Sequence, residues 1–168
     1  CDGGSATAED VRRARNAALA QELSRARALS GLGETDVSEM LETFAEATDA
    51  DGLVSRYGFF TRFGHFIPAD ADEGEVKQLL NQLFNAFQQE GNGSVDFSEL
   101  VTGLTLLCRG AREMKMRAAF ALYDTNGDGF ISVDEMLMFL TSIYRVLLVV
   151  RPGAGPPGAS DQFAAQTT

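Results

Sequence analysis

The chain of 168 residues has few of the residues that would indicate catalysis or a secreted fold. It has two cysteines, Cys1 and Cys108, and one histidine, His65. Two cysteines do not make a disulfide framework, and Cys108, in an apolar helical run, is expected to be a buried reduced thiol. His65 has no cysteine or serine nucleophile nearby, and no glycine-rich phosphate loop follows a strand. The sequence therefore predicts a protein without enzymatic activity in a reducing compartment.

Basic charge and long apolar runs are also scarce. Fourteen basic against 24 acidic residues give a net charge of −10, which disfavours unassisted binding to nucleic acid. The most apolar stretch, 136–150, contains Arg145 and is shorter than the roughly 20 residues that span a bilayer. The polar start predicts no signal peptide. Because that start is not methionine, a segment of a longer protein is an alternative interpretation.

A twelve-residue stretch near the carboxyl end, 124–135 (DTNGDGFISVDE), has oxygen-bearing side chains at positions 1, 3, 5, 9 and 12. A hard divalent cation needs about six or seven oxygens, which so short a loop supplies only from fixed positions. Gly129 at position 6 allows the sharp turn, and Ile131 at position 8 is expected to pair with a neighbouring loop. The stretch predicts a Ca²⁺ site, with Mg²⁺ as an alternative ion. Its predicted ligands are Asp124, Asn126, Asp128, the backbone carbonyl of Phe130, Ser132 and Glu135.

The pattern recurs twice upstream, which indicates an internal repeat. The stretch 88–99 has Gly93 at position 6 and Val95 at position 8, but a neutral glutamine at position 1, so a weak second site is expected. A more eroded copy around Gly52 lacks both end ligands. It is expected to keep its shape without binding calcium, and its Val54 is expected to pair with Val95. The predicted ligands of the weak site are Gln88, Glu90, Asn92, Ser94, Asp96 and Glu99.

Hydrophobic periodicity and capping signals predict an all-helical chain. The predicted helices cover 7–30, a segment from residue 36, 57–66, 75–87, 97–109, 112–123 and 133–150. Thr7 with Asp10 resembles a capping box. The predicted organisation is a helical extension at 1–33, a pair of helix-loop-helix units at 34–110, a third unit at 111–150 and a flexible tail at 151–168.

The segment 100–147 joins an apolar helix, an Arg109-Gly110 turn, a charged helix, the 124–135 loop and a helix with the sequence Ser-Ile-Tyr near its end. It resembles the EF-hand superfamily, and within it the neuronal calcium sensor, potassium-channel-interacting and calcineurin B-like group; ciliary EF-hand sensors are more distantly similar. The resemblance implies an all-α fold of EF-hand repeats with short two-stranded ladders between loops. The chain departs from this group in lacking a Met-Gly start for a myristoyl anchor and a fourth hand after residue 150.

The missing fourth hand predicts that the third is unpaired within the chain. An apolar helix face after the loop is then left uncovered, and large exposed apolar patches mark interaction sites. A further C-terminal segment, a second copy of the chain or a helix of a target protein would cover it; alternatively, helix 7–30 folds back over it. The predicted target-binding residues are Met136, Phe139, Leu140, Ile143 and Leu147.

These features predict a calcium-binding regulatory protein that exposes an apolar groove to a target when calcium binds. Two alternatives remain: a structural subunit of a motor or axonemal assembly, similar to a light chain, and a regulatory segment of a larger protein. The expected location is the cytoplasm, with the cilium or flagellum as a special case.

Overall fold

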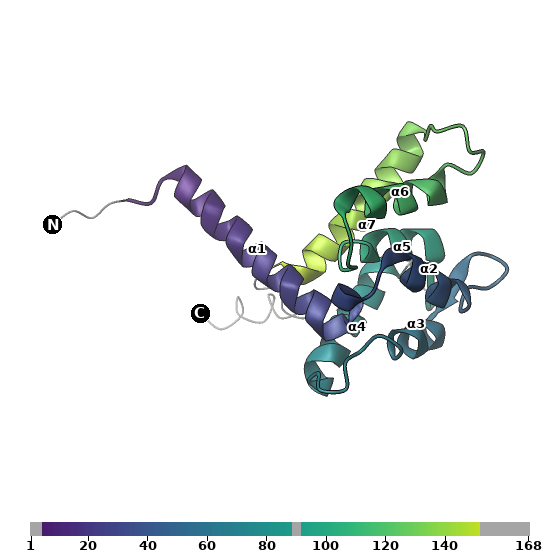
Figure 1. The fold of residues 1–168 in the computed structure, drawn as a ribbon, viewed down its shortest axis with the longest axis horizontal. Coiled ribbons are helices and arrows are strands. Elements are labelled where there is room, and N and C mark those ends of the chain that lie inside the picture. Colours follow the sequence, from purple (N-terminus) through teal and green to yellow (C-terminus); the bar gives the residue numbers. More distant parts are fainter. Residues whose placement is uncertain (1–4, 89–91, 152–168) are drawn as a thin grey trace, which may run out of the picture.

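The computed structural model describes residues 5–88 and 92–151, and within them it confirms the all-α prediction (Figure 1). A short 3₁₀ helix (Leu32–Glu34) links the first two α-helices, and the two strands are β1 (Leu53–Ser55) and β2 (Ser94–Asp96). No helix in these ranges is long and apolar enough to cross a bilayer. The α-helices are α1 (Ala8–Ser30), α2 (Val37–Ala45), α3 (Arg56–Phe63), α4 (Glu73–Phe87), α5 (Phe97–Leu104), α6 (Arg112–Tyr123) and α7 (Val133–Val150).

Helix α1 begins and ends at the predicted signals. The backbone amide of Asp10 donates to the Thr7 hydroxyl (3.2 Å), and the Thr7 amide donates to the Asp10 carboxylate (3.0 Å). The hydrogen bond from the Thr7 hydroxyl, followed by that from its amide, lowers the pKa of Asp10. Gly31 ends the helix at φ +74°, where a β-carbon would overlap the carbonyl oxygen of Phe66. The capping box is confirmed, and glycine is required at the other end.

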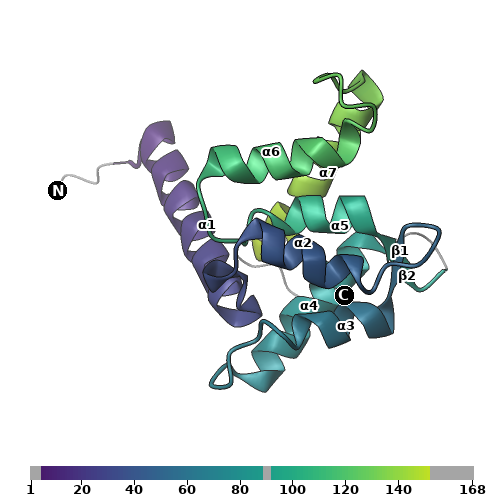
Figure 2. The ribbon, with the colours of Figure 1, turned by 45° about the vertical axis from the view of Figure 1, so that its right-hand side comes forward.

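The first two helix-loop-helix units pair through their loops (Figure 2). Strands β1 and β2 are antiparallel, with Val54 opposite Val95, as predicted. Gly52 and Gly93 both have positive φ, +78° and +65°, so the eroded first loop has kept the sharp turn of the second. Both valines are fully buried, and the ladder therefore joins the two units into one packed pair.

Phenylalanine rings from α2, α3 and α4 form the core of this pair. Phe44 contacts Phe63 edge to face (centroids 5.2 Å apart), and Phe59 contacts Phe84 in the same way (5.3 Å). All four side chains are fully buried. Such geometry adds about 0.5–1.5 kcal/mol per pair to the hydrophobic contribution, so these rings fix how the helices that carry the loops pack.

Helix α5 is shorter than the predicted 97–109, because the chain turns away after Leu104. The Thr105 hydroxyl donates to the carbonyl of Thr102 (2.6 Å), and the Arg109 amide donates to the carbonyl of Thr35 (2.9 Å). The amides of 105–108 bond within local turns, and that of Arg109 bonds to the segment before α2. Backbone pairing between distant segments is not visible in local periodicity, which explains the difference.

Helix α7 packs along α5 and α4, and its far end reaches α1 (Figure 1). Ser142, Val146 and Val150 on one side of α7 are buried, whereas Leu140 and Tyr144 on the other side are more than half exposed. The expectation that little in the chain covers this helix is therefore wrong for one of its faces. The four-part domain division stays a prediction.

Candidate functional site

The first part of the 124–135 loop is folded around three of its predicted side-chain ligands, Asp124, Asn126 and Asp128. The Asp124 carboxylate accepts hydrogen bonds from the amides of Asp128 (3.1 Å) and Gly129 (2.9 Å). The Asn126 side-chain oxygen accepts a second bond from the Asp128 amide (3.1 Å), and the Asp128 carboxylate accepts one from Phe130 (2.8 Å). Gly129 has φ +81°. The first three predicted side-chain ligands therefore share one hydrogen-bonded turn.

The last predicted ligand lies apart from this turn. The Glu135 carboxylate accepts from the Ser132 amide (2.7 Å), and the Ser132 hydroxyl accepts from the Glu135 amide (3.2 Å). This capping box begins α7. Across residues 5–88 and 92–151, no three histidine, cysteine, aspartate or glutamate side chains converge as a metal cluster. If Glu135 is the last ligand, as the sequence predicts, it would have to leave its capping position to join Asp124 and Asp128.

The donor set nevertheless fits a hard divalent cation. The loop offers three carboxylates, an amide oxygen, a hydroxyl and a backbone carbonyl, which are oxygen ligands of the kind that calcium prefers. Asp124, Asn126 and Asp128 already lie on one turn, so binding requires a change mainly at Glu135. Ile131 lies outside any strand in the described chain, and the loop ladder expected for it is not formed with β1 or β2.

The second predicted loop differs at its last ligand. The Glu99 carboxylate is 2.9 Å from the Arg145 guanidinium of α7. Asp96 accepts from the Glu99 amide (2.9 Å) and caps α5, and Asn92 accepts from the Ser94 amide (3.3 Å). The backbone amide of Gln88 donates a hydrogen bond to the carbonyl of Phe84. The predicted ligand Glu90 lies outside the described residues. Arg145 is a site residue that sequence reasoning missed; its signal was a charge in an otherwise apolar helix.

An apolar groove runs between α6 and α7 directly beside the 124–135 loop, with a volume of about 380 Å³. Sequence reasoning missed its α6 wall, since the charged residues of that helix obscured the apolar period. Two predicted target-binding residues, Ile143 and Leu147, do not line this groove. They line an adjoining apolar depression together with Leu140. The groove is lined by Met116, Arg117 and Phe120 of α6, Ile131 of the loop and Met136, Phe139 and Leu140 of α7.

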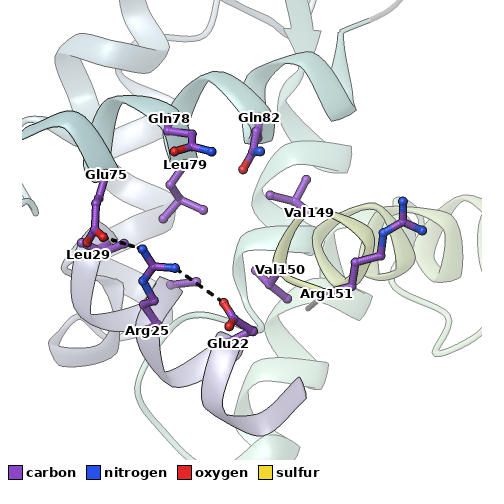
Figure 3. Close-up of a pocket in the computed structure, with 11 residues that line it drawn as sticks. Glu22, Arg25, Leu29, Glu75, Gln78, Leu79, Gln82, Val149, Val150 and Arg151 are labelled. Atoms are coloured by element: carbon purple, nitrogen blue, oxygen red, sulfur yellow. Dashed lines mark hydrogen bonds and ion pairs between the residues drawn. The ribbon is translucent and has the colours of Figure 1, made fainter. Parts of the chain in front are cut away.

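A second cavity, of about 180 Å³, lies where α1, α4 and the end of α7 meet (Figure 3). Arg25 of α1 contacts Glu75 of α4 at 2.6 Å and Glu22 of its own helix at 3.9 Å. Val149 and Val150 of α7 form the opposite wall. The carboxylates that line it already pair with Arg25, so this cavity joins three helices and does not resemble a metal site.

Cys108 is buried, as predicted, with 2% of its surface exposed. Burial raises the pKa of its thiol to about 12, and the nearby Lys115 ammonium opposes this shift. The ammonium donates to the Cys108 carbonyl (3.0 Å), and its own pKa is lowered first by burial and then by Arg27. Thiol chemistry needs the thiolate, so Cys108 is a structural residue.

Comparison with known proteins agrees with this geometry. The EF-hand domain family matches residues 115–144, which include most of α6, the loop and the first part of α7. The chain is 32% identical to guanylyl cyclase-activating protein 2 of Gallus gallus over 120 residues, 70% of this chain and 58% of that protein. It is 33% identical to a guanylyl cyclase inhibitory protein of Lithobates pipiens over 115 residues, 68% of this chain and 53% of that protein.

The chain thus spans a little more than half the length of these relatives. The match falls on the loop whose ligands the sequence predicted, and the EF-hand implies calcium binding. The chain is an EF-hand protein homologous to the guanylyl cyclase-activating proteins, consistent with the neuronal calcium sensor-like group that its sequence resembles.

Proposed function

We propose that this chain is a calcium-dependent regulator in which the 124–135 loop holds the ion and the groove between α6 and α7 binds a helix of a target protein. One observation carries the proposal: the loop and the groove adjoin. Glu135 is the last predicted ligand, and the next residue, Met136, lines the groove. A change at Glu135 therefore acts directly on the groove wall.

The residues that would hold calcium are the six predicted in the loop, and Mg²⁺ would use the same ones. The bound ion would neutralise the carboxylates of Asp124, Asp128 and Glu135. For Glu135 to act as a ligand, it must give up its hydrogen bond to the Ser132 amide. That bond fixes the first turn of α7 to the loop, so its loss changes how the loop enters the helix.

We propose that helix α6 is the part that moves. Its buried residues within the described chain are Ala119 and Tyr123. The second half of α7 is held against α5 by Ser142 and Val146, which are 1% and 0% exposed. We therefore propose that α6 and the loop tilt against a fixed α7, and that this tilt widens the groove.

The groove sets the chemistry of its target. Its walls are apolar and include Met116 and Met136, which are flexible side chains suited to an adaptable surface. Arg117 is the charged residue among the lining side chains. The best fit is an amphipathic helix with an apolar face and one acidic residue opposite Arg117. The names of the relatives make a guanylyl cyclase the first target to test.

The test joins calorimetric calcium titration to fluorescence of the apolar dye 1-anilinonaphthalene-8-sulfonate. We expect one tight calcium per chain and a rise in dye fluorescence on binding. Leu140→Asp, inside the groove, should suppress the rise without changing calcium affinity. Leu137→Asp is the matched control, since Leu137 is exposed on the same helix but does not line the groove. Dye fluorescence that does not change when calcium binds would contradict the proposal.

A permanently bound structural subunit is the second candidate. The observation that favours it is an apolar groove that is already open while Glu135 is held by Ser132. Its signature is a complex with the target that survives in EGTA, whereas a calcium-dependent regulator dissociates or rearranges. In either case we propose that the chain has no catalytic activity of its own and acts in the cytoplasm or cilium.

A further inference from the structure

Arg145 of α7 forms an ion pair with the predicted last ligand of another loop. Its guanidinium lies 2.9 Å from the Glu99 carboxylate, 46 residues away in sequence. The side chain of Glu99 is 13% exposed and that of Arg145 is 31% exposed. The guanidinium also lies 5.7 Å from the centre of the buried Phe87 ring. The pair is thus largely withdrawn from solvent.

A carboxylate in such surroundings requires a positive partner, because an uncompensated charge shielded from water is costly. In an EF-hand the residue at position 12 gives both carboxylate oxygens to the ion, and Glu99 stands at that position of the 88–99 loop. A divalent cation in the 88–99 loop and the guanidinium of Arg145 therefore both require the Glu99 carboxylate. They compete for it unless the Arg145 side chain moves away.

We propose that Arg145 is a tethered cation that occupies Glu99 and so keeps the 88–99 loop from binding calcium until the Arg145 side chain releases that carboxylate. The inference extends the proposed function, because α7 also carries Glu135 at its other end. The two loops then share one helix. By linkage, a change at Arg145 that weakens the Arg145–Glu99 pair strengthens calcium binding at Glu99, and calcium bound there weakens the pair.

The test is calorimetric titration of the whole chain with CaCl₂. Arg145→Met keeps an apolar stem over Phe87 and removes the charge. We expect it to tighten the weaker calcium-binding event about tenfold, or to reveal one where the original chain shows none, leaving the tight event unchanged. That change corresponds to about 1.4 kcal/mol. Arg145→Lys keeps the charge and should resemble the original chain, and Glu99→Gln added to Arg145→Met should abolish the gain.

An unchanged or weaker second event in Arg145→Met overturns the proposal. If that variant fails to fold by circular dichroism, the original chain decides through the Arg145 Nε signal in ¹⁵N nuclear magnetic resonance. A change of this signal at the second equivalent of calcium supports competition, and a constant signal refutes it. Failure of the proposed function would instead appear as the absence of tight calcium binding in calorimetry, or as dye fluorescence that does not change when calcium is added.

Discussion

Gly103 of α5 lies directly against the backbone carbonyl of Ser142 on α7. A β-carbon on Gly103 would be 2.8 Å from that oxygen and 2.5 Å from the Phe87 ring. Both distances are shorter than van der Waals contact permits, so the two helices meet at a residue without a side chain. This contact holds α7 in the position from which Arg145 reaches Glu99.

Replacing Gly103 with alanine should therefore destabilise the fold. In an exposed helix the change gains about 0.5–1 kcal/mol from the reduced freedom of the unfolded chain. Here overpacking should outweigh that gain and leave a net loss of about 1–3 kcal/mol. Urea unfolding followed by circular dichroism measures the difference. Gly74→Ala, in the first turn of α4 with no β-carbon contact shorter than 3.3 Å, is the matched control and should be neutral or stabilising.

The sequence predicted the helices and loops well where one local signal determined them. The bounds of α6 and α7 match the prediction; in α7 the apolar period and the Ser132 capping box agree. The predicted end of α5 was wrong, and the buried face of α7 was missed. Both depend on contacts between segments far apart in the chain, such as Arg109 with Thr35 or Gly103 with Ser142, and no local pattern records these.

Removing the charge of Glu135 should weaken the tight calcium site. Glu135→Gln loses one of three predicted ligating carboxylates, and ligand charge sets the affinity of such loops. We expect calcium affinity in calorimetry to fall by about tenfold or more. Glu113→Gln removes a charge from the first turn of α6, outside the loop, and should leave the affinity near its original value. Equal affinities in all three proteins would refute the ligand assignment.

Gly129→Ala should affect both folding and calcium binding. Gly129 adopts φ +81° with open space around its α-carbon, so the cost arises from backbone strain of about 1–2 kcal/mol. The control is Gly52→Ala at φ +78° in the first loop, where no metal is predicted. Both variants should lower the melting temperature, and only Gly129→Ala should lower calcium affinity. A reduced affinity in Gly52→Ala would instead point to an effect through the fold.

Cys108 should resist alkylation in the folded protein. In a Cys1→Ser background it is the remaining thiol, and a pKa of about 12 leaves very little thiolate at pH 8. Iodoacetamide should therefore react many times faster in denaturant than in buffer, as followed by mass spectrometry. Rapid alkylation of the native protein would show that the thiol is more accessible than its 2% exposure implies.

The same thiol predicts how stability changes in alkali. The folded pKa of about 12 exceeds the ordinary value of 9.0, so the folded state retains a proton that the unfolded chain loses. The contribution of Cys108 to stability is complete below pH 9 and is lost as the pH rises toward 12. Cys108→Ala should show a smaller loss over this window in urea unfolding. The lowered pKa of Lys115 acts in the opposite direction and is common to both proteins.

The candidate site was predictable in part. Asp124, Asn126 and Asp128 lie on one turn because a twelve-residue loop fixes their spacing, and that spacing is visible in the sequence. Met116 was missed because charged residues stand on both sides of it in the sequence of α6. The partner of Glu99 was missed because it lies 46 residues away, in another unit of the repeat.

The two ends of α7 should differ in how easily they open locally, because the second half is packed against the fold and the first turn is exposed. Amide protons from residue 142 onward lie in the part anchored by Ser142, Val146 and Val150 and should exchange with deuterium slowly. Those near Val133, which is 85% exposed, should exchange quickly. The helix is thus held firmly where it packs against the rest of the fold and loosely where it meets the 124–135 loop, so its first turn can rearrange without unfolding the protein.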